Sequence, residues 1–227
     1  MTTERTDRNP DQAETLASDV PRRLRAERER QNISLRELAR RLDVSPSAIS
    51  QIETGRVRPS VAMLYAIVNE LDISMDELFD RDVENRPRRD RNGSLPPQVS
   101  PVVTEDGRTE IEFGKGVAWQ RLTAQADTNV DFLFVTYDPG GSSSPDEHLM
   151  RHLGHEYGLI LSGSLEVTVG FETYVLGAGD SISFASTTPH RLRNVGDVPA
   201  TGVWIVLGRQ GSGAGGHALA GVADASE

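Results

Sequence analysis

The chain has 227 residues, 37% of them hydrophobic and 26% charged, which is an ordinary globular balance and enough for two small cores. It has no cysteine, so disulfides and thiolate metal sites are excluded. It also lacks both an apolar N-terminal segment and a run of eighteen apolar residues, so we expect a cytoplasmic protein that neither is secreted nor contacts the membrane.

The net charge of −10 conceals an asymmetry along the chain. Val20–Ser60 holds ten arginines against five acidic residues, whereas Pro101–Gly208 holds six basic residues against fourteen acidic ones. Local charge, and not the total, sets the attraction to phosphates. The basic segment therefore favours nucleic acid as a partner, although a solvated arginine-rich face has the same composition.

Apolar periodicity divides the chain into a helical part and a β part. Residues 81–100 mix charges with Pro and Gly and show neither period, which predicts a linker. We therefore expect a helical domain over residues 20–80 and a β domain over residues 101–208. Residues 1–19 and 209–227 are rich in small and polar residues, and we expect both to be disordered.

Two helix starts lie close together in the helical part. Ser34–Glu37 is a capping box, in which the serine satisfies an early amide and the glutamate reaches back, and Ser45-Pro46 pairs an N-cap serine with a proline at the first helical position. The second helix ends at Gly55. Asp43 falls in the turn between them, where a left-handed residue is expected.

The remaining helices follow from spacing. An i, i+3, i+4, i+7 stripe predicts a buried helix face, and Ser74–Glu77 caps one last short helix. We expect five helices around one core. The stripe consists of Leu64, Ile67, Val68 and Leu71.

The segment from Leu24 to Phe79 resembles the lambda-repressor-like, xenobiotic-response-element family of helix-turn-helix domains. The most specific part is Ser34–Ser60, in which SLRELA, the small turn and the closing Pro-Ser fall at the family spacing. The resemblance implies that the second helix of the pair enters the major groove of double-stranded DNA. The residues expected at the DNA are Ser34, Arg36, Pro46, Ser47, Ser50, Gln51, Thr54, Arg56 and Arg58.

These residues differ in their expected roles. Gln51 suits a bidentate contact with adenine, and the serines at the start of the helix suit several bases. The arginines after the helix are better placed for phosphates, which position the protein without reading sequence. Glu53 is acidic on the same helix, and we expect it to orient an arginine inside the fold. The apolar residues Leu38, Leu42, Ile49 and Ile52 are expected in the core.

Eight short β-rich segments follow the linker, and they predict a closed barrel or jelly roll. Tyr157–Gly163 and Leu165–Val169 are expected to form a hairpin, and the turn Gly177–Asp180 is expected to join the next pair. The segments are VAWQRLTA, VDFLFVTYD, YGLILSG, SLEVTVG, ETYVLG, SISFA, HRLRNVG and TGVWIVLG.

The landmarks in this part resemble the cupin superfamily, whose fold is a β-barrel of the double-stranded β-helix or jelly-roll type. His152, Glu156 and Gly163 match H-x3-E-x6-G, and Gly179-Asp180, His190 and Asn194 match G-D followed by H-x3-N. Cupin metal sites have three histidines and one glutamate. Here Met150 stands where the family has its first histidine, so the resemblance implies a reduced set of His152, Glu156 and His190.

Two imidazoles and one carboxylate are enough to hold Fe, Zn or Mn with open positions. A barrel whose polar residues bind an organic ligand, or form a satisfied internal network, is the alternative. Strand alternation nominates side chains for the pocket of a small-molecule effector, although apolar strand residues also serve as plain core. They are Trp119, Arg121, Phe132, Phe134, Tyr157 and Phe184.

The combination resembles bacterial transcription regulators of α + β multidomain architecture, in which the cupin domain dimerises and senses a small molecule. It implies a homodimer on a pseudo-palindromic operator and no enzymatic activity. Two alternatives stay open. Hydroxypropylphosphonate epoxidases also join a helix-turn-helix-like domain to an iron cupin with two histidines and one glutamate, which implies an oxygenase-like metal enzyme. A scaffold whose barrel only dimerises would explain the lost histidine.

Overall fold

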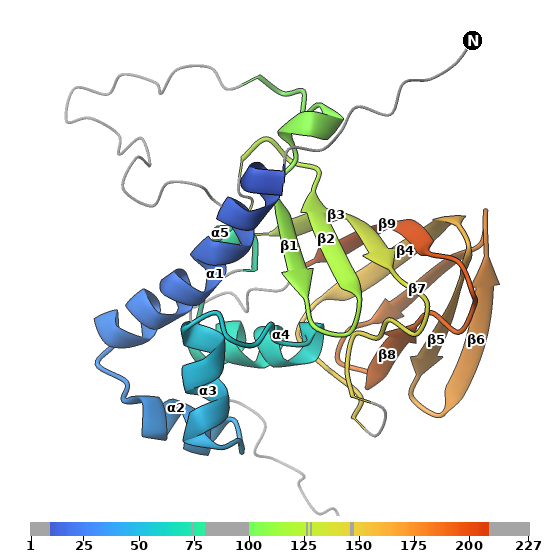
Figure 1. Ribbon diagram of the computed structural model, residues 1–227. Helices are drawn as coiled ribbons and strands as arrows, with labels where there is room; N and C mark the ends of the chain where they lie inside the picture. The colour runs from blue at the N-terminus through green and yellow to red at the C-terminus, as the bar shows by residue number, and fades with distance from the viewer. Residues whose placement is uncertain are drawn as a thin grey trace, which may run out of the picture.

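The computed structural model of the protein shows a helical part packed against a two-sheet β part (Figure 1). Side chains of residues 10–19, 76 and 77 are not described. Most of the expected linker and the expected C-terminal tail lie outside the described residues. The structure describes residues 10–73, 75–79, 100–125, 127, 129–145 and 148–208.

Five α-helices make up the helical part of the described chain, and a 3-10 turn (Glu105–Gly107) precedes the strands. Helix α1 begins ten residues before the expected domain boundary, so the expectation of disorder does not hold for residues 10–19. Gln, Ala, Glu and Leu in that stretch favour helix, and extending an anchored helix needs no new nucleus. The helices are α1 (Pro10–Arg30), α2 (Leu35–Arg41), α3 (Pro46–Glu53), α4 (Val61–Glu70) and α5 (Met75–Leu78).

Serine N-caps start three of these helices. Ser34, Ser45 and Ser60 each accept a hydrogen bond from the backbone amide three residues later, at 3.1 Å. The capping box at Ser34 is only half formed, because the Glu37 carboxylate pairs with two arginines of its own helix instead of reaching back. Asp43 has a φ of 53°, which confirms the left-handed turn between α2 and α3.

The β part has nine strands in the described residues, all antiparallel to their neighbours. A six-stranded sheet has the order β1-β2-β3-β9-β4-β7, and a three-stranded sheet has the order β6-β5-β8. Strand β1 is additional to the eight expected. The strands are β1 (Glu110–Phe113), β2 (Val117–Arg121), β3 (Val130–Tyr137), β4 (His155–Ser162), β5 (Ser164–Val169), β6 (Glu172–Gly177), β7 (Ser181–Ala185), β8 (His190–Arg193) and β9 (Ala200–Leu207).

The two turns expected to close hairpins instead carry the chain from one sheet to the other. Strand β4 pairs with β7 and β9, and β5 pairs with β6 and β8, so the expected hairpin between β4 and β5 is wrong. The turn Gly177–Asp180 likewise joins strands of different sheets. Gly163 has a φ of 70°, and a Cβ there would lie 2.6 Å from the carbonyl oxygen of Pro199. A tight turn fixes where the chain bends but leaves open which strand becomes the neighbour.

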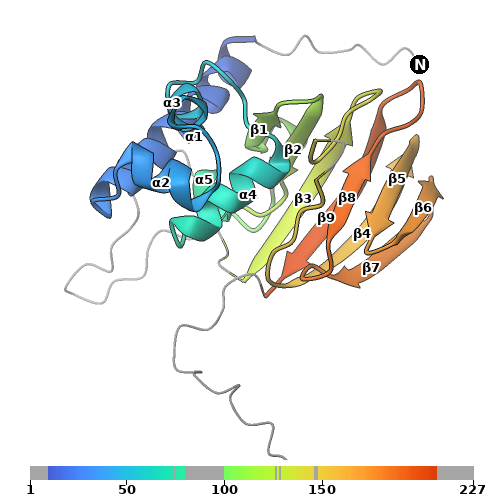
Figure 2. The ribbon, with the colours of Figure 1, turned by 90° about the horizontal axis from the view of Figure 1, so that it is seen from below.

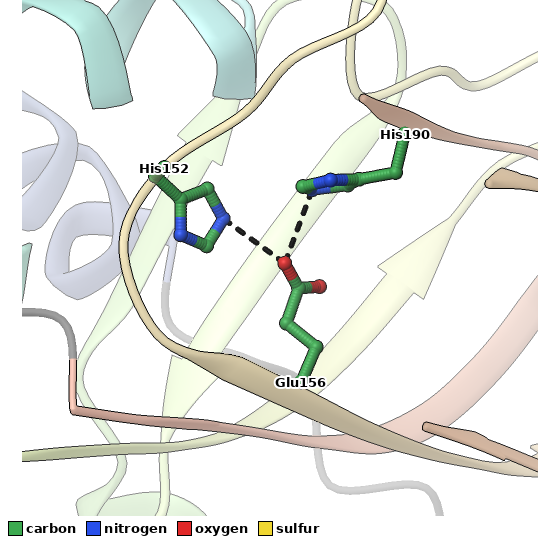
Figure 3. A group of neighbouring side chains, drawn as sticks. All are labelled: His152, Glu156 and His190. Carbon is green, nitrogen blue, oxygen red and sulfur yellow. Dashed lines mark ion pairs between the residues drawn. The ribbon is translucent and has the colours of Figure 1, made fainter. Parts of the chain in front are cut away.

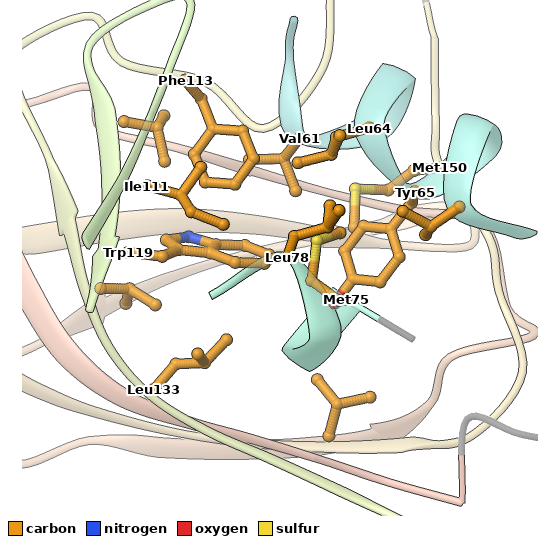
Figure 4. Close-up of a cluster of buried hydrophobic side chains, with 14 of the residues drawn as sticks. Val61, Leu64, Tyr65, Met75, Leu78, Ile111, Phe113, Trp119, Leu133 and Met150 are labelled. Atoms are coloured by element: carbon orange, nitrogen blue, oxygen red, sulfur yellow. The ribbon is translucent and has the colours of Figure 1, made fainter. Parts of the chain in front are cut away.

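Helix α4 lies beside the strands of the β part (Figure 2), and the helical and β parts share one continuous hydrophobic core (Figure 4). Two backbone hydrogen bonds of 2.9 Å cross the boundary, from the amide of Ala62 to the carbonyl of Ser143 and from the amide of Gly114 to the carbonyl of Pro59. The packing fixes helix α4 against the barrel. Among the described residues, no helix combines the length and apolar character needed to cross a bilayer.

Candidate DNA-reading surface and metal centre

Helix α3 presents a polar row to solvent while its apolar side is buried. Ile49 and Ile52 are in the core, and Ser47 and Gln51 are exposed one turn apart, with the Gln51 amide donating to the Ser47 hydroxyl at 3.4 Å. Ser50 is half-buried beside them. The side chains of Ser47 and Gln51 are both at the solvent-exposed surface, where an amide that can bond in a bidentate way and a hydroxyl suit contacts with base edges.

The other residues expected at the DNA flank this row. Ser34, Arg36, Pro46, Thr54, Arg56 and Arg58 are all exposed. Thr54 donates its hydroxyl to the carbonyl of Ser50 at 2.7 Å, which closes the end of α3. The Arg58 guanidinium pairs with the Glu112 carboxylate on β1 at 2.5 Å.

A buried ion pair fixes α3 to α1. The Arg28 guanidinium donates to both carboxylate oxygens of Glu53, at 2.6 and 2.8 Å, and also to the carbonyl of Ile33 at 2.8 Å. The hydrogen bonds to Glu53 raise the pKa of Arg28 above its ordinary value. The expectation that Glu53 orients an arginine inside the fold is confirmed.

In the barrel, two imidazoles and one carboxylate converge on a point (Figure 3). His152 Nε2 and His190 Nε2 each lie 3.0 Å from Glu156 Oε1, and all three side chains are buried. The three ligand atoms lie within 4.8 Å of one another. Glu156 is on β4 and His190 begins β8, whereas His152 lies in the irregular segment before β4.

The second nitrogen of each imidazole fixes the tautomer. Nδ1 of His152 is 2.9 Å from the carbonyl of Leu153, and Nδ1 of His190 is 2.8 Å from the carbonyl of Thr188. A carbonyl accepts only, so each Nδ1 carries the hydrogen, and a neutral ring has a bare lone pair at Nε2. Three lone-pair donors then meet in a buried space with no hydrogen-bond partner among the described residues. Such a set needs a cation or added protons, and it fits a divalent metal.

Glu156 is held from its other oxygen. Trp204 Nε1 donates to Glu156 Oε2 at 2.7 Å. The indole packs directly against Gly158, where a Cβ would fall 2.0 Å from the nearest ring atom. Burial raises the pKa of the Glu156 carboxyl, but its pairing with the two imidazoles outweighs this and leaves the pKa well below the ordinary value. Burial also lowers the pKa of His190, and the Glu156 carboxylate reverses this to a net rise.

Comparison with known proteins gives the same division of the chain. A helix-turn-helix family model matches residues 24–78, and a cupin-domain family model matches residues 133–206. This chain is a helix-turn-helix protein with a C-terminal cupin domain.

Known proteins match this chain over most of their own length. The "HTH-type transcriptional regulator PuuR" of Escherichia coli is 27% identical over 175 residues, which cover 76% of this chain and 86% of the relative. The structure of an "HTH_3 family Transcriptional Regulator" from Vibrio cholerae superposes with a TM-score of 0.58 at 22% identity, over 86% of this chain and 98% of that one. The second likeness shows the common fold.

Met150 takes the place of the missing histidine in the cupin domain. Its backbone pairs with that of His190 through hydrogen bonds of 2.9 and 2.8 Å, and its side chain is buried beside the ligands. His148, two residues earlier, is exposed. A cavity against Glu156 has a volume of about 10 Å³, close to the minimum for one water molecule. Its lining consists of Tyr65, Trp119, Val135, Tyr137, Met150, Glu156, Leu192 and Trp204.

The side chains expected to line an effector pocket divide into two groups. Trp119, Arg121 and Phe184 are buried, and the Phe184 ring lies 5.0 Å from that of His190. Phe132 and Phe134 alternate with the buried residues of β3 and so face outward, and Tyr157 is 44% exposed on β4. The outward placement of these three is contrary to the expectation, because the alternation of a strand fixes two faces without saying which one is inside.

One residue beside the ligands was not expected from the sequence. Tyr65 of α4 is 2% exposed and lines the same cavity, although it belongs to the helix-turn-helix domain. In the sequence it is one more apolar position of a buried helix, so no local signal assigns it to the cupin site.

Proposed function

We propose that this protein is a sequence-specific, DNA-binding transcription regulator that works as a homodimer in the bacterial cytoplasm and whose cupin domain is the sensor. The main observation that supports the proposal is the exposed pair of Ser47 and Gln51 on α3. The buried ion pair between Arg28 and Glu53 holds this helix in place. Exposed arginines at positions 36, 56 and 58 flank it and suit phosphates. The PuuR relative, named as a transcriptional regulator, supports this reading.

The outer face of the six-stranded sheet supports a homodimer through the cupin domain. Tyr157, Leu159 and Leu161 are 44%, 40% and 47% exposed on β4. The register places Ile205 and Val203 of β9 beside the first two and, beyond them, Phe132 and Phe134 of β3. An apolar surface of this extent on a folded domain is typical of a protein interface. A second copy on this face would give the two-fold symmetry that a pseudo-palindromic operator requires, with recognition helices roughly 34 Å apart.

For the cupin domain, we propose a divalent metal held by His152, Glu156 and His190. Iron, zinc and manganese all accept two imidazoles and a carboxylate, and Met150 offers at most a soft, weak ligand to such ions. The metal would supply the positive charge that balances the three convergent lone pairs, and its open coordination positions could bind a small effector. The cavity against Glu156 has room for about one water, so a larger effector that enters it has to displace a lining side chain.

The oxygenase-like enzyme is the rival function. The cavity against Glu156 is far below the roughly 300 Å³ at which sites for organic ligands begin, which disfavours an organic substrate there. A scaffold barrel is also less favoured, because a buried triad of titratable groups is costly in a domain that only dimerises.

Selection of DNA fragments from a genomic library tests the main proposal. We expect the wild-type protein to recover a recurring pseudo-palindrome, and the double variant Gln51→Ala, Arg56→Ala to lose it by roughly tenfold or more. The selection is repeated at two salt concentrations. Binding that depends on salt but recovers no common sequence would contradict the proposal and favour the oxygenase-like enzyme instead.

Light scattering after gel filtration tests the dimer. Leu159→Glu places a charge in the proposed interface and should give a monomer at micromolar concentration. Phe171→Glu is the matched control, because this fully exposed side chain lies on the turn between β5 and β6 of the other sheet. A Leu159→Glu protein that stays dimeric would show that the copies meet elsewhere.

A further inference from the structure

Tyr65 brings the DNA-binding domain into contact with a metal ligand. Its ring lies parallel to the imidazole of His152, with centroids 4.3 Å apart and planes 6° from parallel. Trp119 of β2 meets the same tyrosine edge-on at 5.9 Å, which fixes the ring from the barrel side (Figure 4). The stack is buried, since Tyr65 is 2% and His152 6% exposed.

Side-chain packing matters more for the orientation of His152 than for that of Glu156 or His190, because His152 lies outside the regular strands. Glu156 and His190 are on β4 and β8, each of which pairs with neighbours in its own sheet. His152 lies in an irregular segment tied by two backbone hydrogen bonds of 3.0 Å, from the His152 amide to the carbonyl of Ser186 and from the Ser186 amide to the carbonyl of Gly154. Its Nδ1 donates to the adjacent residue Leu153, which moves with it. The ring plane of His152 is therefore set by side-chain packing, with the face of Tyr65 stacked on it at 4.3 Å and the ring of His190 edge-on at 5.3 Å.

We propose that Tyr65 is a positioning residue for the metal centre, and that through it metal occupancy and the docking of helix α4 on the barrel stabilise each other. This inference rests on the proposed metal site. A ligand held in the right orientation before the ion arrives binds more tightly, and outer-shell partners of metal ligands are worth roughly 10- to 100-fold in affinity.

The same coupling acts on the helix. Helix α4 is docked by the Tyr65 stack, by the Ala62–Ser143 backbone bond and, at the segment before it, by the Gly114–Pro59 bond. A metal that fixes His152 fixes one surface of that docking site. By thermodynamic reciprocity, a tenfold gain in metal affinity from Tyr65, about 1.4 kcal/mol, is also the gain in docking free energy from the metal.

The consequence for DNA binding follows from chain continuity. Only residues 54–60 separate the end of α3 from the start of α4, so a firmly docked α4 fixes the recognition helix relative to the barrel. In a dimer held by the barrels, that placement sets the distance between the two recognition helices. The metal centre would thus tune operator affinity without touching DNA.

Zinc affinity of the full-length protein, measured by competition with a coloured chelator, tests the proposal. We expect Tyr65→Leu to bind Zn²⁺ roughly tenfold more weakly, and Tyr65→Phe, which keeps the ring, to stay within about twofold of wild type. Phe113→Leu is the matched control, since this buried ring packs on Trp119 at the same boundary without contacting His152.

Hydrogen exchange of the wild-type protein gives a second measurement that needs no variant. Zinc should slow amide exchange across residues 61–70 as well as near the ligands. Unchanged exchange in α4, wild-type affinity in Tyr65→Leu, or an equal loss in Phe113→Leu would each overturn the role of Tyr65. A wild-type protein that binds no zinc would overturn the metal site itself, while the DNA selection would still stand or fall on its own.

Discussion

On the recognition helix, the side chains of Ser47 and Gln51 reach solvent, whereas in the cupin domain the ligand side chains are buried and braced by a tryptophan, a tyrosine and two backbone carbonyls. The two sites demand different things of the fold. Side chains that read DNA need a rigid helix beneath them and freedom at their tips. A metal site needs its donor atoms in place before the ion arrives. Substitutions in the buried pair beneath the recognition helix should therefore harm the first site most. Substitutions of the residues that hold His152 and Glu156 in place should harm the second.

The largest effect is expected where the recognition helix is anchored. Arg28→Ala leaves the Glu53 carboxylate buried without its bidentate partner, which should lower the free energy of unfolding by about 3 kcal/mol and weaken operator binding with it. Chemical denaturation measures the change. Arg25→Ala removes an exposed pair with Glu29 on the same helix and should be close to neutral. Equal losses in both variants would mean that the buried pair does not anchor α3.

The exposed row was predictable from the sequence, because it depends on short spacings. The inward role of Glu53 was also predicted, but its partner Arg28, 25 residues away, was not. Serine caps, the left-handed Asp43 and the helical stripe act over a few residues, so the pattern fixes α2, α3 and α4 together. The same local reasoning paired β4 with β5 incorrectly, because the neighbour of a strand in a jelly roll depends on contacts far along the chain.

The convergence of His152, Glu156 and His190, which could hold a metal, was predictable only through the resemblance to the cupin motifs, and the side chains that hold these residues in place were not predictable. Trp204 is 48 residues from Glu156, and Tyr65 lies in another domain from His152. No period or spacing links such pairs. The core shared by the two domains was missed for the same reason, since each domain looked self-sufficient in composition.

The second-largest effect is expected at Trp204, which holds the Glu156 carboxylate in place. Gly158→Ala puts a Cβ where the Trp204 indole lies, so the ring has to move and its hydrogen bond to Glu156 is lost. We expect a loss of about 2 kcal/mol in stability and weaker zinc binding. Gly177→Ala meets only an ordinary contact at 3.7 Å and serves as the control. Thermal unfolding with and without zinc would separate the two contributions, and unchanged zinc affinity would show that Trp204 does not brace the carboxylate.

The third effect is a dependence of stability and zinc affinity on pH. The exposed row on α3 should show no such dependence over the same pH range. The Glu156 carboxylate raises the pKa of His190, so without metal this pair stabilises the fold below about pH 6.5, the ordinary histidine value, and loses that contribution as pH rises through the raised pKa. Metal binding needs the neutral ring and so changes in the opposite direction. Zinc affinity should fall roughly tenfold per pH unit below that pKa. His148→Gln, an exposed control, should keep the profile, and a flat profile would contradict neutral His190 as a ligand.

The smallest effect joins the two domains through Arg58, which is expected at a phosphate but in the structure pairs with Glu112 of the cupin domain. A carboxylate and a phosphate cannot both hold one guanidinium fully, so the barrel competes with DNA for this arginine. The pair is exposed, 57% at Arg58 and 37% at Glu112, which limits its strength. Glu112→Gln should therefore tighten operator binding only roughly twofold in fluorescence anisotropy. Glu110→Gln makes the same charge change on the same strand, where the side chain accepts from Gln120, and should give less. Equal tightening in both variants would assign the effect to net charge and not to competition for Arg58.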